Sequence, residues 1–247
     1  MNLLDILAYL FELVGLTDDN YDLTQMPIDI TVHGFVIDRR MTVKEAITPL
    51  MKAYLFDVIE AGGKIKCIPR GGDTVKTINS GELGVVEYGS EPGPSVTVTR
   101  PQESEFPTKV KVQYIDKNTD YQVDEQEYEL EEEKTFINEV SEKFPIVMTS
   151  TQAVQLAEKL MHTSWQQRTN FEVVVNLDHI DLEPADVFVL TGYNILITDI
   201  NLHLPAFISI KGVSEDQTTY ISDAEPAETE FKGQVVQKDM ITLSSEA

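Results

Sequence analysis

Apolar positions in the first forty residues recur first with a helical period and then with a strand-like one. Leucine, isoleucine and phenylalanine stand three or four residues apart over 3–14, which predicts an amphipathic helix. Asn2 is the expected N-cap of this helix, and Gly15 is its expected end. A polar loop follows, and the pattern over 28–38 then predicts a short strand.

Two further local signals follow this strand. Thr42 and Glu45 have the spacing of a capping box, in which a hydroxyl and a carboxylate each satisfy a free backbone N–H at the start of a helix. Two alternating runs then flank Gly62 and Gly63, a pair that favours a tight β-hairpin. Residues 1–72 are therefore predicted to form a small α+β module with helices packed on one face of a sheet.

The middle of the chain changes character twice. The stretch 73–107 is rich in Gly, Pro, Ser and Glu, which indicates a linker, with short strands expected at 84–87 and 95–99. The run 109–115 alternates strictly and predicts a strand with one exposed face. Residues 124–133 carry seven carboxylates in ten positions. Such a run repels itself, so a solvated, mobile loop is expected there, with cation binding or partner docking as the functional alternative.

The second half switches from a helical to a strand period. Thr149 and Gln152 indicate a second capping box for a helix over 150–168. Beyond that helix, four strand-like runs are separated by turns: NFEVVVNL, DVFVL, NILITDINL and AFISIKGV. Residues 108–232 are thus predicted to form an antiparallel β-barrel or sandwich domain with one packed helix, and 233–247 a polar tail or a linker to a further domain. The predicted fold class of the chain is α+β.

Charge and cysteine content narrow the classes of function. The 247 residues include 42 acidic and 19 basic ones, a net charge of -23, so the surface would repel nucleic acid phosphates and anionic lipid. No stretch of about eighteen apolar residues occurs, so no membrane insertion is expected. Cys67 is the only cysteine and is expected to be a small strand residue. It cannot form a disulfide within the chain, which suits assembly in a reducing cytoplasm.

Catalytic and ligand-binding motifs are absent from the sequence. None of the four histidines has metal-ligand spacing, and the nearest approach, DHID at 178–181, falls in a predicted turn where aspartate is common for backbone reasons. The segment RGGD at 70–73 is interpreted as a turn, because no helix clearly follows it. Trp165 has the helical spacing of a core residue. We therefore expect no enzyme activity, no cofactor, and no catalytic, cofactor-binding or metal-binding residues.

Several short segments share their order with one known family. They are GFVIDR at 34–39, Pro49-Leu50, Phe56, Gly62-Gly63, the strand 107–116 with Asp120-Tyr121 after it, the helix 153–168, and LEPADV at 182–187. Together they resemble the tail hub (baseplate hub) proteins of long-tailed bacteriophages and of gene transfer agents. That family usually has Gly where Ala185 stands. All of these motifs are caps, turns and strand ends, so the resemblance carries over no active site.

The resemblance implies a structural role at the tip of a tail. Such a hub is a homotrimeric ring that connects the tail tube to the distal tip and passes the tape measure protein and then DNA, without specific DNA binding. The expected partners are the distal tail protein, the tape measure protein and the tail-tip or receptor-binding proteins. The expected location is the virion tail tip, after assembly in the bacterial host cytoplasm.

Ring symmetry and charge give two more expectations. Three subunits with two barrels each would match a six-fold tail tube, but one barrel is evident in this sequence. The other barrel would lie in a flanking part if the sequence is a fragment of a longer hub. Part of the excess negative charge is expected to line the lumen of the ring and to keep DNA from adhering.

Two alternatives remain open at this point. A carbohydrate-binding module of a tail tip, directed at the host surface, would be favoured by exposed aromatic residues gathered on one loop face. The candidates for that face are Tyr121, Tyr128, Tyr193 and Tyr220. The second alternative is a hub domain associated with a cell-wall hydrolase, which measurable activity on peptidoglycan or polysaccharide would favour.

Overall fold

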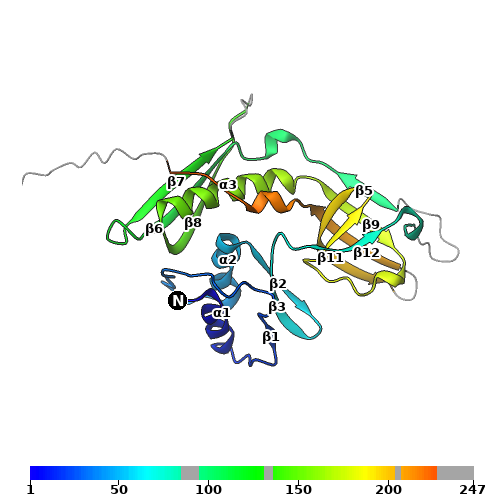
Figure 1. Cartoon of the computed structure of the whole chain (residues 1–247), viewed down its shortest axis with the longest axis horizontal. Helices are drawn as coiled ribbons and strands as arrows, with labels where there is room; N and C mark the ends of the chain where they lie inside the picture. The colour runs from blue at the N-terminus through cyan, green and yellow to red at the C-terminus, as the bar shows by residue number, and fades with distance from the viewer. Residues whose placement is uncertain (85–94, 131–135, 204–206, 227–247) are drawn as a thin grey trace, which may run out of the picture.

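The computed structural model describes residues 1–84, 95–130, 136–203 and 207–226 (Figure 1). The α-helices and β-strands of these residues are, in chain order, α1 (Leu3–Glu12), β1 (Tyr21–Asp22), α2 (Val43–Tyr54), β2 (Phe56–Ala61), β3 (Lys64–Pro69), β4 (Thr74–Ile78), β5 (Val96–Thr99), β6 (Lys109–Asp116), β7 (Val123–Glu129), β8 (Glu139–Met148), α3 (Ser150–Gln166), β9 (Asn170–Val175), β10 (Val187–Leu190), β11 (Tyr193–His203) and β12 (Phe207–Ser214).

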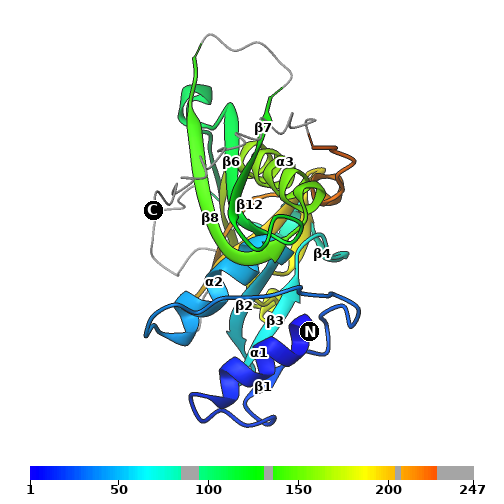
Figure 2. The same cartoon turned by 90° about the vertical axis from the view of Figure 1, so that its left-hand side faces the viewer.

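The molecule has three parts that surround one long helix. In Figure 1 the N-terminal module of α1, α2 and β1–β3 lies at the bottom, a three-stranded sheet lies at the left and a six-stranded sheet at the right. Helix α3 lies above the module and runs from the sheet β7-β6-β8 toward the six-stranded sheet. Figure 2, turned by 90°, shows the N-terminal module at the lower end and the three-stranded sheet with α3 at the upper end.

The local signals of the N-terminal module are confirmed. The Asn2 side chain accepts a hydrogen bond from the backbone N–H of Leu4, and the capping box of Thr42 with Glu45 is complete. Strands β2 and β3 form an antiparallel hairpin, and the short β1 pairs with β3 in parallel. The φ angles of Gly62 and Gly63 are 60° and 73°, which glycine adopts without steric cost and which a type I′ hairpin turn requires.

The short strand predicted over 28–38 is wrong. This segment makes only two isolated β-bridges, Thr31 with Asn2 and Phe35 with Ile146. Each bridge goes to a different neighbour, because the segment crosses from the start of α1 to the end of β8. It therefore forms no continuous ladder, although Val32 is buried as its alternating pattern requires.

The three-stranded sheet has the order β7-β6-β8, antiparallel between β7 and β6 and parallel between β6 and β8. The strand predicted over 109–115 is confirmed as β6 with its alternating pattern, but the face predicted to be exposed is half-buried. The mobile loop predicted over 124–133 is wrong in its first half, since β7 occupies Val123–Glu129, and 131–133 lie outside the described residues. Helix α3, whose capping box at Thr149 and Gln152 is confirmed, packs on β6 and β7.

The six-stranded sheet has the order β4-β10-β11-β12-β9-β5. The four strands predicted after α3 are confirmed as β9–β12, with antiparallel pairs β10–β11, β11–β12 and β12–β9. The stretch 73–107 supplies both edges of the sheet. The strand predicted at 95–99 is confirmed as β5, whereas β4 was not expected, and most of the strand proposed at 84–87 lies outside the described residues.

The six-stranded sheet curls around its own core. Its buried cluster comes from β4 and β9–β12 together with Leu182, and no residue of α3 belongs to it. Gly212 of β12 pairs with Ile197 of β11, next to a register shift between Ile197 and Asp199. A bulge and a glycine at such a point increase the curvature of a sheet. Strands β4 and β5 do not pair with each other among the described residues, so the sheet is sandwich-like and not a closed barrel.

A second, larger core joins the N-terminal module to the three-stranded sheet and α3. Its fully buried members include Leu7, Leu50, Phe56, Tyr114 and Met161, which come from five different elements. The α+β class is therefore confirmed, with α3 packed on the sheet β7-β6-β8. No helix of the described segments is both long and apolar enough to cross a membrane.

Candidate functional site

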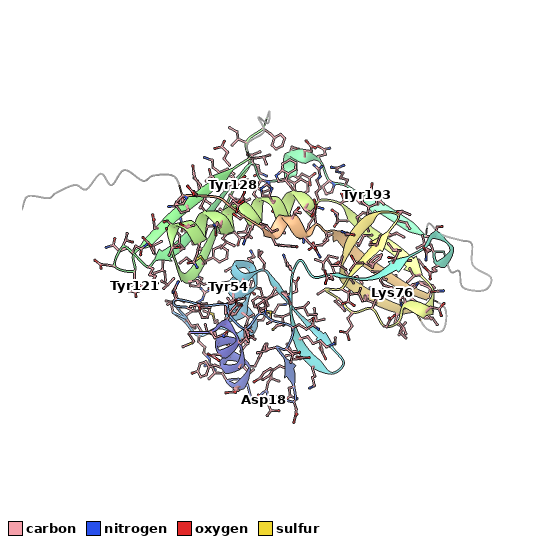
Figure 3. The ribbon with its side chains drawn as sticks, viewed as in Figure 1. Asp18, Tyr54, Lys76, Tyr121, Tyr128 and Tyr193 are labelled. Carbon is pink, nitrogen blue, oxygen red and sulfur yellow. The ribbon has the colours of Figure 1, made fainter. Side chains whose placement is uncertain are left out.

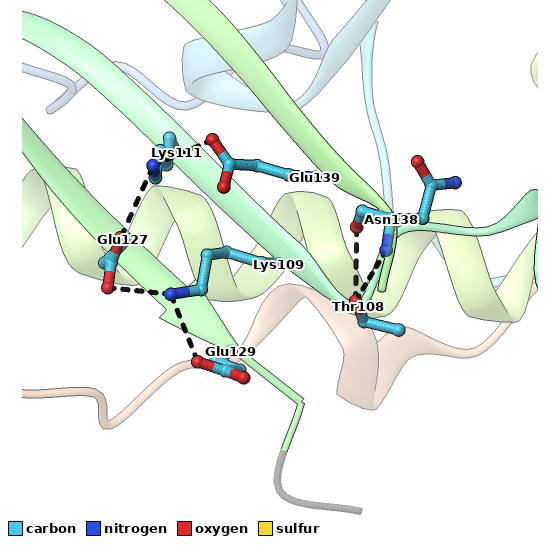
Figure 4. A network of polar contacts seen from close by, with 7 residues as sticks. All are labelled: Thr108, Lys109, Lys111, Glu127, Glu129, Asn138 and Glu139. Atoms are coloured by element: carbon cyan, nitrogen blue, oxygen red, sulfur yellow. Dashed lines mark hydrogen bonds and ion pairs between the residues drawn. The ribbon is translucent and has the colours of Figure 1, made fainter. Parts of the chain in front are cut away.

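The outer face of the three-stranded sheet carries a ladder of opposite charges (Figure 4). Lys109 Nζ lies 3.0 Å from a carboxylate oxygen of Glu127 and 3.2 Å from one of Glu129. Lys111 Nζ lies 2.7 Å from Glu139 and 3.9 Å from Glu127. Hydrogen bonds to Glu127 and to Glu139 raise the pKa of Lys109 and of Lys111, respectively. The lysines of β6 thus neutralise acids that would otherwise repel one another in β7.

The same face is fixed at one end by a side chain clamp. Thr108 Oγ1 accepts a hydrogen bond from the backbone N–H of Asn138 at 3.0 Å, and the Thr108 N–H donates to the Asn138 carbonyl at 2.8 Å (Figure 4). This clamp sets the register of β6 against β8. Because its charges are satisfied within the chain, the face is a poor candidate for cation binding, the functional alternative for the acidic run.

The N-terminal module contains an open groove of about 580 Å³. It lies between the end of α1, one side of α2 and the β2–β3 hairpin. Apolar side chains from these elements form most of its lining, among them Val14, Leu16, Ile47, Met51, Val58 and Ile65. Val14 is 57% exposed at one end of this groove.

Basic residues surround this groove. Lys44, Lys52 and Arg70 line it together with a single acid, Glu60. The stretch 39–70 as a whole holds seven of the 19 basic residues and three of the 42 acidic ones. The groove is therefore apolar inside and basic at its rim, in a chain that is otherwise strongly acidic.

The turn between β6 and β7 presents two exposed apolar side chains at one end of the sheet β7-β6-β8. Tyr121 is 65% exposed and Val123 is 74% exposed, and Figure 3 shows Tyr121 at the outer end of the sheet. Asp120 and Tyr121 have φ angles of 52° and 58°, a left-handed conformation that non-glycine residues rarely adopt. Such strain concentrates at functional positions.

The four tyrosines proposed for a sugar-binding face do not gather on one face. Tyr121 and Tyr193 lie toward opposite ends of the molecule, and Tyr128 lies near α3 (Figure 3). The Tyr128 ring packs 5.8 Å from the ring of His162, and Tyr220 is half-buried against Gly71. The arrangement that would favour the carbohydrate-binding alternative is thus not present among the described residues.

The DHID segment lies in the loop between β9 and β10. Lys76 Nζ lies 2.7 Å from the Asp181 carboxylate and also donates to the Asp178 carbonyl at 3.2 Å. His179 is buried, with Nε2 3.7 Å from Glu82 Oε1. A lysine therefore occupies the position where a cation would be needed, and the described residues contain no group of three potential metal ligands.

Cys67 and Trp165 occupy structural positions. Cys67 lies in β3 and is 1% exposed, and burial raises the pKa of its thiol to about 12, so the strand residue predicted from the sequence is confirmed. Trp165 packs against the large core, and its Nε1 donates to the Pro107 carbonyl at 2.7 Å. Its ring lies 5.7 Å from that of Phe106, which ties α3 to the segment that leads into β6.

A polar junction that the sequence did not reveal joins the N-terminal module to the six-stranded sheet. Arg70 binds Asp57 through two hydrogen bonds of 2.7 and 2.8 Å, and Lys66 Nζ lies 2.5 Å from Glu183 in the β9–β10 loop. Beside Arg70, Glu215 is 5% exposed, and burial raises the pKa of its carboxyl group. The Asp57–Arg70 pair spans the two ends of the hairpin, so only the β2–β3 register could have indicated it.

Comparisons with known proteins agree on one family. Residues 42–200, more than half of the chain, match the model of a family described as "Putative phage tail protein". No curated protein matches the sequence.

Three solved structures share the fold. A chain of the virion of a native gene transfer agent particle is 17% identical with a TM-score of 0.76, over 91% of this chain and 49% of that one. A tail protein from Neisseria meningitidis MC58 is 12% identical with a TM-score of 0.61, over 89% of this chain and 69% of that one. A 43 kDa tail protein of prophage MuSo2 from Shewanella oneidensis is 11% identical with a TM-score of 0.56, over 89% and 64%. The chain thus spans about half the length of the gene transfer agent chain.

Proposed function

Because this chain belongs to the phage tail protein family, we propose that it is a structural subunit of the hub ring at the tip of a phage or phage-like tail. In this role it connects the tail tube to the distal tip, and the tape measure protein and then DNA pass through the ring. The observation that carries the proposal is the agreement in fold, at a TM-score of 0.76 over 91% of this chain, with a protein of an assembled virion.

The open edges of the six-stranded sheet support a role in assembly. Strands β4 and β5 are its two edges, and neither has a hydrogen-bonded strand on its outer side within the described residues. Val75 on β4 is 59% exposed and Val98 on β5 is 57% exposed. Proteins that work alone usually protect such edges with charge, proline or a covering segment, because free edges pair with other chains.

The proposed ring is a homotrimer whose subunits contact one another through different surfaces. Contacts of this kind close into a ring when the rotation between neighbours is a simple fraction of a turn. Its neighbours would be the distal tail protein, the tape measure protein and the receptor-binding parts of the tip, and its place the virion after assembly in the host cytoplasm. The role is structural and not catalytic.

The charge of the chain gives the ring lumen its proposed property. Outside the stretch 39–70, 39 acidic residues face 12 basic ones. We place part of this excess on the lumen wall, where it would let DNA slide past without adhering. Neither the carbohydrate-binding nor the hydrolase-associated alternative gains a specific observation in its favour from the described residues.

Light scattering at a high and a low protein concentration, with electron images of the same sample, tests the proposal. A trimeric ring with a central hole is the expected result, and a structure of that ring would test for an acidic inner wall. A monomer at every concentration would contradict ring formation by this chain, and a neutral or basic inner wall would refute the proposed property of the lumen.

A further inference from the structure

The groove of the N-terminal module and the turn between β6 and β7 have complementary chemistry. The groove is lined by apolar residues of α1, α2, β2 and β3, and it has a basic rim. The turn and the start of β7, residues 117–125, present two exposed apolar side chains among acids; we refer to this segment as the β6–β7 tip. Tyr121 and Val123 are the apolar members, the acids are Asp120, Asp124 and Glu125, and Lys117 is the one basic residue. Asp124 and Glu125 accept hydrogen bonds from Tyr114 and Gln113 of β6.

The rim of the groove has basic groups available for a partner. Lys44 lines the groove at the start of α2, and Arg39 and Arg40 are exposed in the segment just before that helix. None of the three forms an ion pair within the described residues, although the charge of Arg39 helps to lower the pKa of Glu45. By contrast, Lys52 and Arg70 at the other end of the groove already bind Glu142 and Asp57. The free positive charge therefore gathers at the α2 end, where an acidic partner would be attracted.

The β6–β7 tip is shaped as an anchor. Tyr121 has a left-handed backbone conformation, with a φ of 58°, and its side chain is 65% exposed at the end of the sheet. Exposed tyrosines with few rotatable bonds are common anchors of protein interfaces. No residue of the tip lines the groove of its own chain, so the two surfaces remain available to different neighbours.

We propose that the groove of one copy of this chain binds the β6–β7 tip of a second copy. Tyr121 and Val123 enter the apolar groove, and the acids of the tip face Arg39, Arg40 and Lys44. The contact joins two different surfaces, so each subunit gives its tip to one neighbour and receives the tip of another, as a ring requires. The proposal rests on the proposed function, since it specifies the contact from which the ring is built.

Two single variants with matched controls test this contact. Tyr121→Ala is expected to weaken self-association roughly tenfold or more, as loss of an interface anchor does. Tyr193→Ala removes a tyrosine that is 58% exposed on the six-stranded sheet and should leave association unchanged. Lys44→Glu is expected to weaken association, whereas Lys64→Glu, at the hairpin turn outside the groove, is the control of equal charge change.

A charge exchange separates a lost contact from a damaged fold. Lys44→Glu and Glu125→Lys should each weaken association, and the double variant should recover it, because each new charge meets its opposite on the neighbouring copy. Sedimentation equilibrium at two salt concentrations measures all variants, and the wild-type association should fall as salt rises.

The outcomes distinguish this inference from the function on which it rests. If the wild type associates but Tyr121→Ala and the charge exchange change nothing, the groove–tip contact is refuted and the hub proposal stands. If the wild type stays monomeric at every concentration, both proposals fail together.

Discussion

The two hydrophobic cores of this protein are shielded from solvent in different ways. The larger core is assembled from helices and strands of the N-terminal module, the three-stranded sheet and α3, so helices cover sheets. The smaller core lies inside a single sheet that curls until its own strands cover one another. The first depends on contacts between separate elements, and the second depends on the shape of one sheet. Substitutions in the larger core should therefore act on the packing of helices against sheets. Substitutions in the six-stranded sheet should also act on its curvature.

The largest expected effects come from emptying each core in turn. Phe188→Ala and Phe56→Ala each remove a ring that is 0% exposed, and each should lower the free energy of unfolding of its region by about 3–5 kcal/mol. Hydrogen exchange should accelerate in β9–β12 for the first variant and in the N-terminal module for the second. Reaction of Cys67 with a thiol reagent reports the larger core only. If Phe188→Ala exposed Cys67 as much as Phe56→Ala, the two cores would form one cooperative unit.

Alanine substitutions at Gly212 in the curled sheet and at Gly62 in the β2–β3 turn should have different effects on stability. A Cβ at Gly212 would lie 2.5 Å from Ile195 Cγ2 and 2.6 Å from the Leu196 carbonyl oxygen. Gly212→Ala should therefore flatten or split the curled sheet and cost about 1–3 kcal/mol in denaturant unfolding. Gly62→Ala meets no atom within 4 Å and carries only left-handed strain, about 1 kcal/mol. If both variants lost the same free energy of unfolding, close contacts at Gly212 would not control the curvature of the sheet.

The junction between the two regions should respond to pH. Burial raises the pKa of Glu215 in the folded protein, so its protonated form is favoured there. The stability linked to this group is complete below its unfolded pKa of about 4.5, and it is lost as pH rises through the folded value. Glu215→Gln, which stays neutral, should therefore unfold at higher denaturant concentration than the wild type at pH 7.

Unfolding midpoints measured from pH 4 to pH 8 test this expectation. The advantage of the glutamine variant should shrink toward pH 4, where the wild-type carboxyl group is increasingly protonated. A constant difference across this range would mean that the buried charge is fully compensated by the neighbouring Arg70.

The smallest expected effect concerns one residue in each region that adopts a left-handed conformation. Ala185, in the loop before β10, has a φ of 70°, and the family that the sequence resembles usually has glycine there. Ala185→Gly should stabilise the protein by a few tenths to about 1 kcal/mol, because strain is relieved. Leu55, after α2, has a φ of 54° but is buried, so Leu55→Gly should destabilise in the same thermal scan. Destabilisation by Ala185→Gly would argue against strain at this turn.

The sequence predicted correctly those features that depend only on residues close together in the chain. The capping boxes at Thr42 and Thr149 and the turn at Gly62-Gly63 depend on residues within four positions of one another, and all three are confirmed. Strand β7 was not predicted, because its acidic residues are neutralised by a lysine of another strand, β6. Strand β4 was missed because its partner, β10, follows more than a hundred residues later.

Of the two surfaces of the proposed contact, one was indicated by the sequence and the other was not. Tyr121 was singled out in the sequence because of the aromatic residue in a turn, and it is exposed as that interpretation requires. The groove could not be foreseen, since its lining comes from four elements whose packing no periodicity specifies. The basic excess over 39–70 is visible in the sequence and was the available signal for it.

The order of strands in the six-stranded sheet has a consequence for synthesis on the ribosome. Strand β4 ends at Ile78, but its partner β10 begins at Val187, with the three-stranded sheet and α3 encoded between them. At about 5–20 residues per second, β4 waits on the order of 5–20 s before its partner exists. During that interval β4 has no partner strand in its own chain. Nascent chains on adjacent ribosomes of the same polysome then carry unpaired β4 strands close to one another. Slowing translation between β4 and β10 should therefore increase aggregation of the nascent chains.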